Sequence, residues 1–218
     1  MKNLNLFLSG LMCLFLITSS AFSQGDIYIH FGPSFPMEDF ADEEEAGVGL
    51  GLGFQYTYPI TESGLGMFIG IDFAYNGLNQ DMKEDIEEET GLDDDDITFS
   101  KFLNFPVSAG LNYTLNADSN IALIANAGLT GNFLKITDLV FETPTGDVTV
   151  KYDLSSGFGY KLGAGVLINK KTSIEINYFG LGDYDIDAEG EIPGEAMQEF
   201  EAETEIDILL ITIGFLLE

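Results

Sequence analysis

The chain has 218 residues, of which 37 are acidic and 8 are lysine, with no arginine, so its formal net charge is −29. A negative excess of this size excludes charge-driven binding to nucleic-acid backbones and to anionic membrane surfaces. Hydrophobic residues nevertheless make up 45% of the chain and its mean hydropathy is +0.14, which excludes a disordered acidic polymer. Charged and apolar residues must therefore be concentrated in different segments.

Residues 1–23 have the features of a secretory signal peptide. Lys2 precedes the apolar core LFLSGLMCLFLITSS, and the segment AFSQ that follows carries small residues at a cleavage site, so we expect cutting before Gln24. The apolar core is short for a membrane-anchoring helix. Residues 24–218 then form the mature domain. The only cysteine, Cys13, lies inside the apolar core, so the mature domain has neither disulfides nor thiolate metal sites.

Eight segments of the mature domain alternate apolar side chains with small or polar ones, which is the period of a β-strand. In chain order they are Ile27–Phe35, Ala46–Ile60, Leu65–Asn76, Lys101–Leu115, Asn120–Phe133, Gly157–Ile168, Thr172–Gly182 and Ile206–Leu217. The second segment, AGVGLGLGFQYTYPI, has glycine at every second position from Gly47 to Gly53. A dinucleotide-binding loop needs a different glycine spacing and a turn from strand to helix. We therefore interpret these glycines as the small face of a strand.

Short and long connections alternate between these segments. The short ones are residues 59–64, 116–119 and 169–171, and the long ones are roughly residues 36–45, 77–99, 136–155 and 183–205. An even number of strands with short turns on one side and long loops on the other is typical of a transmembrane β-barrel. The bulky apolar face would not fit inside eight strands, so it must face lipid. The predicted fold class is all-β, an eight-stranded antiparallel up-and-down transmembrane β-barrel.

The polar face of each strand should line the lumen, where glycines leave room for larger side chains. The residues predicted to line it are His30, Gln55, Asp72, Asn104, Asn112, Asn126, Lys161 and Glu175. Lys161 is the only cation placed inward, and we expect it to neutralise an inward carboxylate that the strand register does not identify. The last segment is apolar on both faces. Its outward residues are predicted to be Leu209, Ile211, Ile213, Phe215 and Leu217.

Several stretches resemble the porin-family outer-membrane β-barrel domain of Bacteroidetes-type Gram-negative bacteria. They are the signal ending AFSQ, the first strand IYIHFGPSF, the segment FLNFPVSAGLNYTL with its inward proline, and the glycine-rich GFGYKLGAGVLINKKTSIEINYFGLGD. The resemblance covers essentially the whole mature domain and implies a location in the outer membrane of a Gram-negative bacterium. Many such barrels end on an aromatic residue. This chain departs from that pattern, because it ends in GFLLE and its last aromatic residue is Phe215.

Enzymes of this shape use a serine–histidine pair supported by a carboxylate or an amide. The mature domain has one histidine, His30, and the nearest serine along its strand is Ser34. We therefore expect His30 to be a structural hydrogen-bonding residue and the protein not to be an enzyme, with no catalytic residue and no cofactor. Eight strands rarely leave an aqueous pore, which favours a closed polar lumen and a structural or surface-interaction role. A narrow cation-preferring channel for ions or small solutes is the alternative.

The four long connections carry 30 of the 37 acidic residues. Part of DMKEDIEEETGLDDDDITF is expected to be helical, but its spacing is not that of an EF-hand. A solvated, self-repelling surface is one interpretation, and a site for divalent cations or a partner is the other. The weak metal candidates are Glu87, Glu88, Glu89, Asp93, Asp94, Asp95 and Asp96. The expected partners are outer-membrane lipid, lipopolysaccharide and divalent cations at the loops, with no nucleic acid, and the expected state is a monomer.

Overall fold

The structure is a computed structural model that describes residues 25–144, 146–193 and 197–217, so the predicted signal peptide lies outside the described residues. The helical elements are the α-helices α2 (Asp39–Asp42) and α3 (Gln80–Thr90) and the 3-10 helix η1 (Asp94–Asp96). The strands are β1 (Asp26–Met37), β2 (Gly49–Pro59), β3 (Leu65–Gly77), β4 (Ile97–Thr98), β5 (Lys101–Leu115), β6 (Ile121–Ile136), β7 (Leu139–Phe141), β8 (Val148–Tyr152), β9 (Leu154–Ile168), β10 (Thr172–Glu191) and β11 (Gln198–Leu217).

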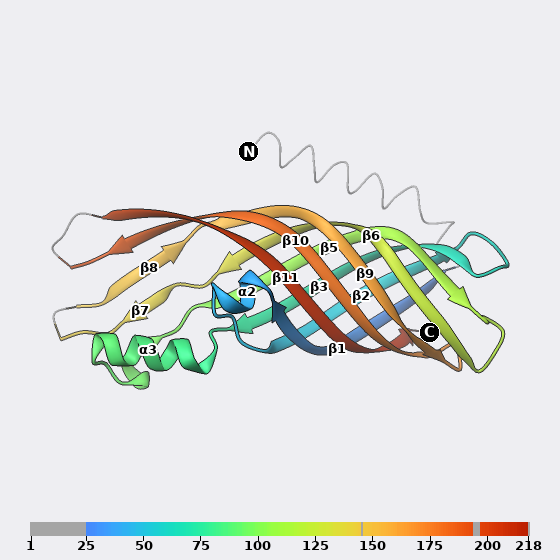
Figure 1. The fold of residues 1–218 in the computed structure, drawn as a ribbon, viewed down its shortest axis with the longest axis horizontal. Helices are drawn as coiled ribbons and strands as arrows, with labels where there is room; N and C mark the ends of the chain where they lie inside the picture. The colour runs from blue at the N-terminus through green and yellow to red at the C-terminus, as the bar shows by residue number, and fades with distance from the viewer. Residues whose placement is uncertain (1–24, 145, 194–196, 218) are drawn as a thin grey trace.

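Eight of these strands form a closed antiparallel ring. Its order is β1, β2, β3, β5, β6, β9, β10 and β11, and β11 pairs with both β10 and β1. Strands that follow one another around the ring also follow one another along the chain, apart from the short strands that lie outside it. Figure 1 shows the tilted ring strands packed side by side. The predicted eight-stranded, antiparallel, up-and-down arrangement is confirmed.

The two faces of the ring differ sharply in chemistry. In β5, Phe105, Val107 and Leu111 are 40%, 42% and 53% exposed, whereas Asn104 and Ser108 on the other face of the strand are completely buried. The same alternation of exposed large apolar side chains with buried small or polar ones runs along the other ring strands. A ring with its apolar side chains on the outside is suited to a hydrocarbon environment.

Two of the strand predictions can be compared directly with the structure. β5 has the predicted bounds, Lys101–Leu115. On β11 the predicted outward residues Ile211, Ile213, Phe215 and Leu217 are all exposed and Leu209 is half-buried, so the assignment of the two apolar faces is confirmed.

Beyond the ring, β10 and β11 continue as a long two-stranded hairpin. β8 pairs with the outer part of β10, β7 pairs with β8, and β4 pairs with β7. Together they form an extension at one end of the molecule, on the left in Figure 1. The prediction that residues 136–155 and 183–205 are long loops is wrong for most of their length. Apolar and acidic residues alternate along residues 183–191, and this period of two continues the strand despite its charge.

The remaining long connections contain the helices. α3 lies in the acidic segment that was expected to be partly helical. The Asn79 side chain caps its first turn by accepting a hydrogen bond from the Met82 backbone amide, and Gly91 ends it in a left-handed conformation with φ 67°. α2 is a single short turn that carries Phe40. Among the described residues, no helix is both long enough and apolar enough to cross a membrane.

Candidate functional site

The short turns that join β2 to β3, β5 to β6 and β9 to β10 lie at one end of the ring, which we call the turn end. The opposite end carries α2, α3 and the extension, and we call it the loop end (Figure 1). Buried polar side chains from all eight ring strands lie between the two ends. These side chains and the space above them at the loop end are the candidate functional regions of the molecule.

An ionic layer is centred on Asp72 of β3. One carboxylate oxygen of Asp72 lies 2.6 Å from Nε2 of His30, and the other lies 3.3 Å from Nζ of Lys161. The Lys161 ammonium also lies 3.5 Å from the Gln55 side-chain oxygen. These four residues come from β1, β2, β3 and β9, so the layer links both sides of the ring. Asp72 is therefore the inward carboxylate that Lys161 was expected to neutralise.

Aromatic rings and glycines complete the ionic layer. The Lys161 ammonium lies 5.5 Å from the centre of the Phe68 ring and 4.9 Å from that of Phe179, within the range of cation–π attraction. A Cβ atom on Gly53 would overlap the side chains of His30 and Asp72. At this position the glycine run therefore makes room for an ion pair, as expected for a strand whose small face lines a narrow barrel.

Towards the turn end, Glu175 forms a second polar group. Its carboxylate accepts hydrogen bonds from Nδ2 of Asn126 at 3.0 Å and from the Ser173 hydroxyl at 2.7 Å. A small cavity of about 80 Å³ opens beside it, and Asn112 and Gln55 also line this cavity. The cavity is large enough for ordered water but small compared with ligand pockets of several hundred Å³.

Towards the loop end, uncharged polar pairs bridge neighbouring strands. Nδ2 of Asn132 lies 2.7 Å from the Asn104 side-chain oxygen and 2.7 Å from the Tyr184 hydroxyl. The Ser108 and Thr130 hydroxyls are 2.8 Å apart. Each of these buried side chains thus has at least one polar partner, while among the described residues Nδ2 of Asn104 and Oδ1 of Asn132 make no hydrogen bond.

A hydrophobic cluster closes the ring beyond these pairs. The cluster combines residues near the loop ends of β3, β5, β6, β10 and β11 with Ala46 and with one residue of α2, Phe40, which is completely buried. The Phe40 ring packs edge-to-face against Phe102 at a centroid distance of 5.1 Å. Leu181 and Leu210, also buried, lie in the same cluster. The short helix in the first long connection thus carries an apolar side chain that seals the end of the lumen.

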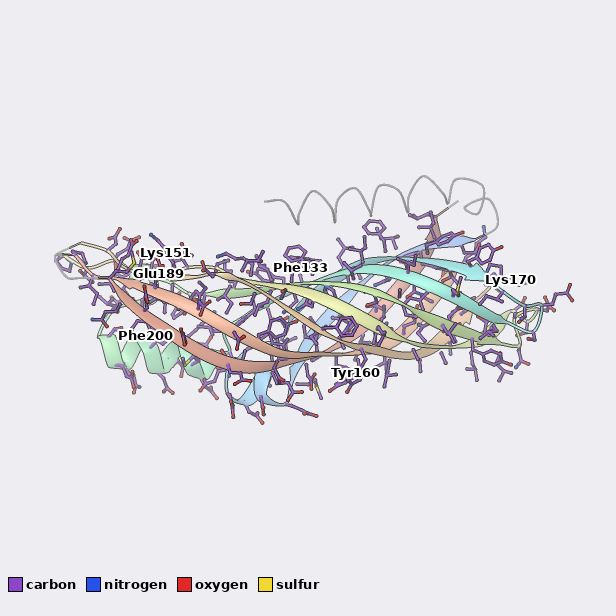
Figure 2. All side chains as sticks on the ribbon, turned by 90° about the horizontal axis from the view of Figure 1, so that it is seen from above. Phe133, Lys151, Tyr160, Lys170, Glu189 and Phe200 are labelled. Carbon is purple, nitrogen blue, oxygen red and sulfur yellow. The ribbon has the colours of Figure 1, made fainter. Side chains whose placement is uncertain are left out.

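A larger pocket of about 400 Å³ lies above this cluster, between α3 and the inner face of the extension. Its lining is mostly apolar and includes Met82 and Ile86 on α3 and Phe200 on β11. Figure 2 shows Phe200 on the extension in the region occupied by α3. Two carboxylate residues, Glu43 and Glu44, also line it. This pocket could not be predicted from the sequence, because two of its walls belong to segments predicted to be loops.

The outer face of the extension is strongly acidic. Four pairs of acidic residues lie directly opposite each other across β10 and β11, and all eight side chains are exposed: Asp183 and Glu205, Asp185 and Glu203, Asp187 and Glu201, and Glu189 and Glu199. The charge of Asp207, together with burial and the charge of Asp183, raises the pKa of Glu205. Lys151 on β8 lies opposite Glu189 and forms an ion pair of 2.6 Å with Glu191 (Figure 2).

The weak metal candidates are not assembled into a site. Glu87, Glu88 and Glu89 are consecutive on α3, while Asp94–Asp96 form the separate turn η1 that follows Asp93. Across the described residues, no group of three or more His, Cys, Asp or Glu side chains is arranged to hold a metal ion. Binding of divalent cations at the loops therefore stays a prediction.

All eight residues predicted to line the lumen are buried within the ring. His30, Gln55, Asp72 and Lys161 form the ionic layer, Asn126 binds Glu175, Asn104 binds Asn132, and Asn112 lines the small cavity. The Ser34 hydroxyl donates to the Asn76 side chain at 3.0 Å rather than contacting His30. The sealing role of Phe40 was not predicted. Asn132 falls on the predicted polar face of its strand but is not among the eight predicted lumen residues.

One acidic residue occupies the outward register of the ring. Asp207 of β11 alternates with Leu209 and the other outward residues, yet it is only 3% exposed. The Tyr178 hydroxyl donates to its carboxylate at 2.6 Å, and the Tyr178 ring packs against Tyr160 at 5.9 Å between centroids. Tyrosines thus cover this carboxylate where the ring meets the extension.

Comparison with known families identifies the class of barrel. Residues 9–200 match the model of the family described as outer membrane protein beta-barrel domain. The chain belongs to this family. The match spans most of the 218 residues and ends near the start of β11. A comparison with curated protein sequences found no match.

Solved structures with a similar course of the chain include three bacterial outer-membrane proteins. OprG from Pseudomonas aeruginosa aligns at 14% identity and TM-score 0.49, covering 89% of this chain and 97% of OprG. A major outer membrane protein from Thermus thermophilus aligns at 12% identity and TM-score 0.46, covering 88% of this chain and 99% of that protein. Ail, the attachment invasion locus protein of Yersinia pestis, aligns at 14% identity and TM-score 0.45, covering 88% of this chain and 97% of Ail.

Proposed function

We propose that the protein is an integral outer-membrane β-barrel with a closed polar lumen, whose role is structural or lies in interactions at an acidic outer surface. The observation that carries this proposal is the continuous filling of the lumen. The ionic layer around Asp72 is followed by bridging asparagines and then by the apolar cluster that contains Phe40. An ion crossing this path would have to displace the buried Lys161–Asp72 pair and an apolar seal, both of which oppose its passage.

The proposed orientation follows the usual arrangement of such barrels, with short turns in the periplasm and longer connections outside. The extension and its exposed acidic residues would then face the surroundings of the cell. We propose that outer-membrane lipid and lipopolysaccharide surround the monomeric ring. We also propose that the protein is not an enzyme, since the hydroxyl of Ser34, the nearest serine along the strand of His30, is bonded to Asn76 and both His30 and Ser34 are buried.

Electrical recording tests the closed lumen. The mature chain, refolded and inserted into planar lipid bilayers, should give no discrete conductance steps above those of protein-free bilayers in concentrated potassium chloride. Removing the seal with Phe40→Ala, or shortening the side chains of the ionic layer with Lys161→Ala and Asp72→Ala together, should leave a wider and better-hydrated path and raise the frequency of openings. Regular, cation-selective steps from the wild-type protein would favour instead the alternative function, a narrow cation-preferring channel.

Cell fractionation tests the location. We expect the protein in the outer-membrane fraction of a Gram-negative bacterium, with an amino terminus that begins at Gln24 after removal of residues 1–23. Terminal sequencing of the purified protein measures the cleavage position. Recovery of the chain as a freely soluble periplasmic protein would contradict the proposed function, because the exposed apolar face needs lipid.

A further inference from the structure

The pocket at the loop end has the composition of a binding site rather than of a packing defect. Its volume of about 400 Å³ falls within the range of small-molecule sites, and most of its lining is apolar. Met82 and Ile86, one helical turn apart on α3, form one wall. Phe200, which is 52% exposed, stands on the opposite wall at β11. An apolar body placed between α3 and the extension would cover these surfaces.

Two glutamate residues give the pocket a negative charge. Glu43 and Glu44 follow directly after α2 and line the pocket. Burial raises the pKa of Glu44, against a hydrogen bond from Thr204 that lowers it, so its charge is held in a partly desolvated position. Neither glutamate takes part in the ion pairs found among the described residues. A cation entering the pocket would supply the missing countercharge.

A hydroxyl group provides a second polar contact. Ser100 is 5% exposed and lines the pocket, and within the described part of the chain its oxygen makes no hydrogen bond of ordinary length and angle. The Tyr152 hydroxyl is near enough that Ser100 lowers its pKa, although burial raises it more. A buried hydroxyl with spare hydrogen-bonding capacity in a pocket wall is suited to a ligand that donates hydrogen bonds.

The charge around the pocket also favours a cationic ligand. The four long connections carry 30 of the 37 acidic residues and only Lys83 and Lys151 in their predicted ranges. Lys83 lies over the Phe99 ring, and Lys151 is paired with Glu191. A concentration of carboxylates around a concave apolar surface raises the local concentration of cations and lowers that of anions.

We propose that this pocket binds a small amphiphile, with its apolar body between α3 and the extension and its cationic amine group beside Glu43 and Glu44. The ammonium would pair with the two carboxylates and donate to the Ser100 hydroxyl. A carboxylate of the same length would meet like charge, and an uncharged alcohol would gain the apolar contacts alone. This inference does not depend on whether the lumen conducts.

Three probes of equal length test the proposal: 4-phenylbutylamine, 4-phenylbutan-1-ol and 4-phenylbutyrate. Binding to the mature protein in nanodiscs of zwitterionic lipid is measured by calorimetry at fixed ionic strength, with protein-free nanodiscs as the blank. We expect the amine to bind about tenfold more tightly than the alcohol, since charge-assisted hydrogen bonds contribute that much, and the carboxylate to bind most weakly.

Matched variants identify the site. Glu43→Gln with Glu44→Gln should weaken amine binding about tenfold and leave alcohol binding unchanged. Glu201→Gln with Glu203→Gln removes the same charge from the outward face of β11 and should change neither. Ala202→Trp, which fills the pocket, should weaken binding of both. Migration of unheated samples on gels verifies that each variant keeps a folded ring.

The proposal would be overturned if the alcohol or the carboxylate bound as tightly as the amine. Equal losses from the two double variants would mean that diffuse charge, not the pocket, attracts the amine. Unchanged amine binding by a folded Ala202→Trp variant would place the ligand elsewhere. Failure of this test leaves the closed lumen unaffected, because bilayer recording measures that property separately.

Discussion

The contact between Lys161 and Asp72 holds two opposite charges inside the ring, away from bulk water. Removing an ion from water costs several kcal/mol, and attraction between the partners offsets this cost only when the remaining donors and acceptors are also satisfied. Here His30 takes the second oxygen of Asp72, and Gln55 and the Phe179 ring contact the ammonium. Each member of the layer thus depends on the others.

Replacing one partner of this pair should lower the free energy of unfolding more than replacing both. Lys161→Met leaves the buried Asp72 carboxylate without its lysine and should lower the free energy of unfolding by about 3–5 kcal/mol. Lys161→Met combined with Asp72→Asn should recover most of that loss. Urea unfolding in detergent or lipid vesicles measures both values. A double variant that loses as much as the two single variants added together would contradict the coupling.

Replacing glycine by alanine should have different effects on the two faces of the ring, since Gly53 faces the lumen whereas Gly131 lies in the outward register of β6 between Leu129 and Phe133. Gly53→Ala would push a methyl group into the side chains of His30 and Asp72 and should destabilise the ring by about 1–3 kcal/mol, the usual cost of overpacking. Gly131→Ala is the control. Nothing lies within 4 Å of the added atom there, and the smaller backbone entropy of the unfolded alanine chain should make it neutral or stabilising. Equal losses at the two positions would show that glycine is needed for backbone flexibility and not for space.

At the scale of whole elements, the period of two was sufficient to predict the ring. It predicts the bounds of β5 and the outward face of β11, because in a membrane barrel one face of each strand must be apolar and the other must fit a narrow lumen. The eight lumen residues follow from the same alternation. The alternation does not predict which of these residues contact one another, since the contact of Lys161 with Asp72 depends on the tilt and spacing of strands that are far apart in sequence.

The extension was not predicted, because the high charge of residues 183–205 indicated a loop although their period of two is that of a strand. Residues 183–191 read DYDIDAEGE, where acidic residues alternate with mostly apolar ones, and β11 shows the same alternation from Glu199 to Glu205. Such a pattern is that of a strand with one solvated face, although its charge resembles that of a loop. Pairing of β8, β7 and β4 onto this hairpin could not be predicted, because none of them is longer than five residues.

The facing acids of the hairpin should repel one another. Asp187 lies directly opposite Glu201, and unlike charges at such a pair are worth about 0.2–1 kcal/mol in an antiparallel sheet. Asp187→Lys should therefore slow amide hydrogen exchange in the outer hairpin, less so in concentrated salt. Adding Glu201→Lys to this variant restores like charges and should remove the gain. Further protection in the double variant would mean that total negative charge matters, not the facing pair.

At the scale of the whole molecule, apolar and acidic residues are separated as the composition requires. The ring presents large exposed side chains such as Leu52, Ile71 and Leu129, and the exposed carboxylates gather at the loop end. Figure 2 shows Lys170 at the opposite, turn end of the molecule and Lys151 beside Glu189 on the extension. With the closed lumen that we propose between these ends, interactions of the molecule are expected at its two surfaces and not along its axis.

A barrel in the outer membrane requires direct contact between the outward face of its ring and lipid hydrocarbon. The chain has no tryptophan, so one introduced indole reports on a single position. Val107→Trp places it on the exposed apolar face of β5, and Ser63→Trp places it in the turn between β2 and β3. In vesicles, brominated lipid chains should quench the fluorescence of the Val107→Trp variant strongly and acrylamide should quench it weakly, with the reverse for Ser63→Trp. Equal acrylamide quenching in both variants, with no effect of brominated lipid on the Val107→Trp variant, would show that this face does not lie in the membrane.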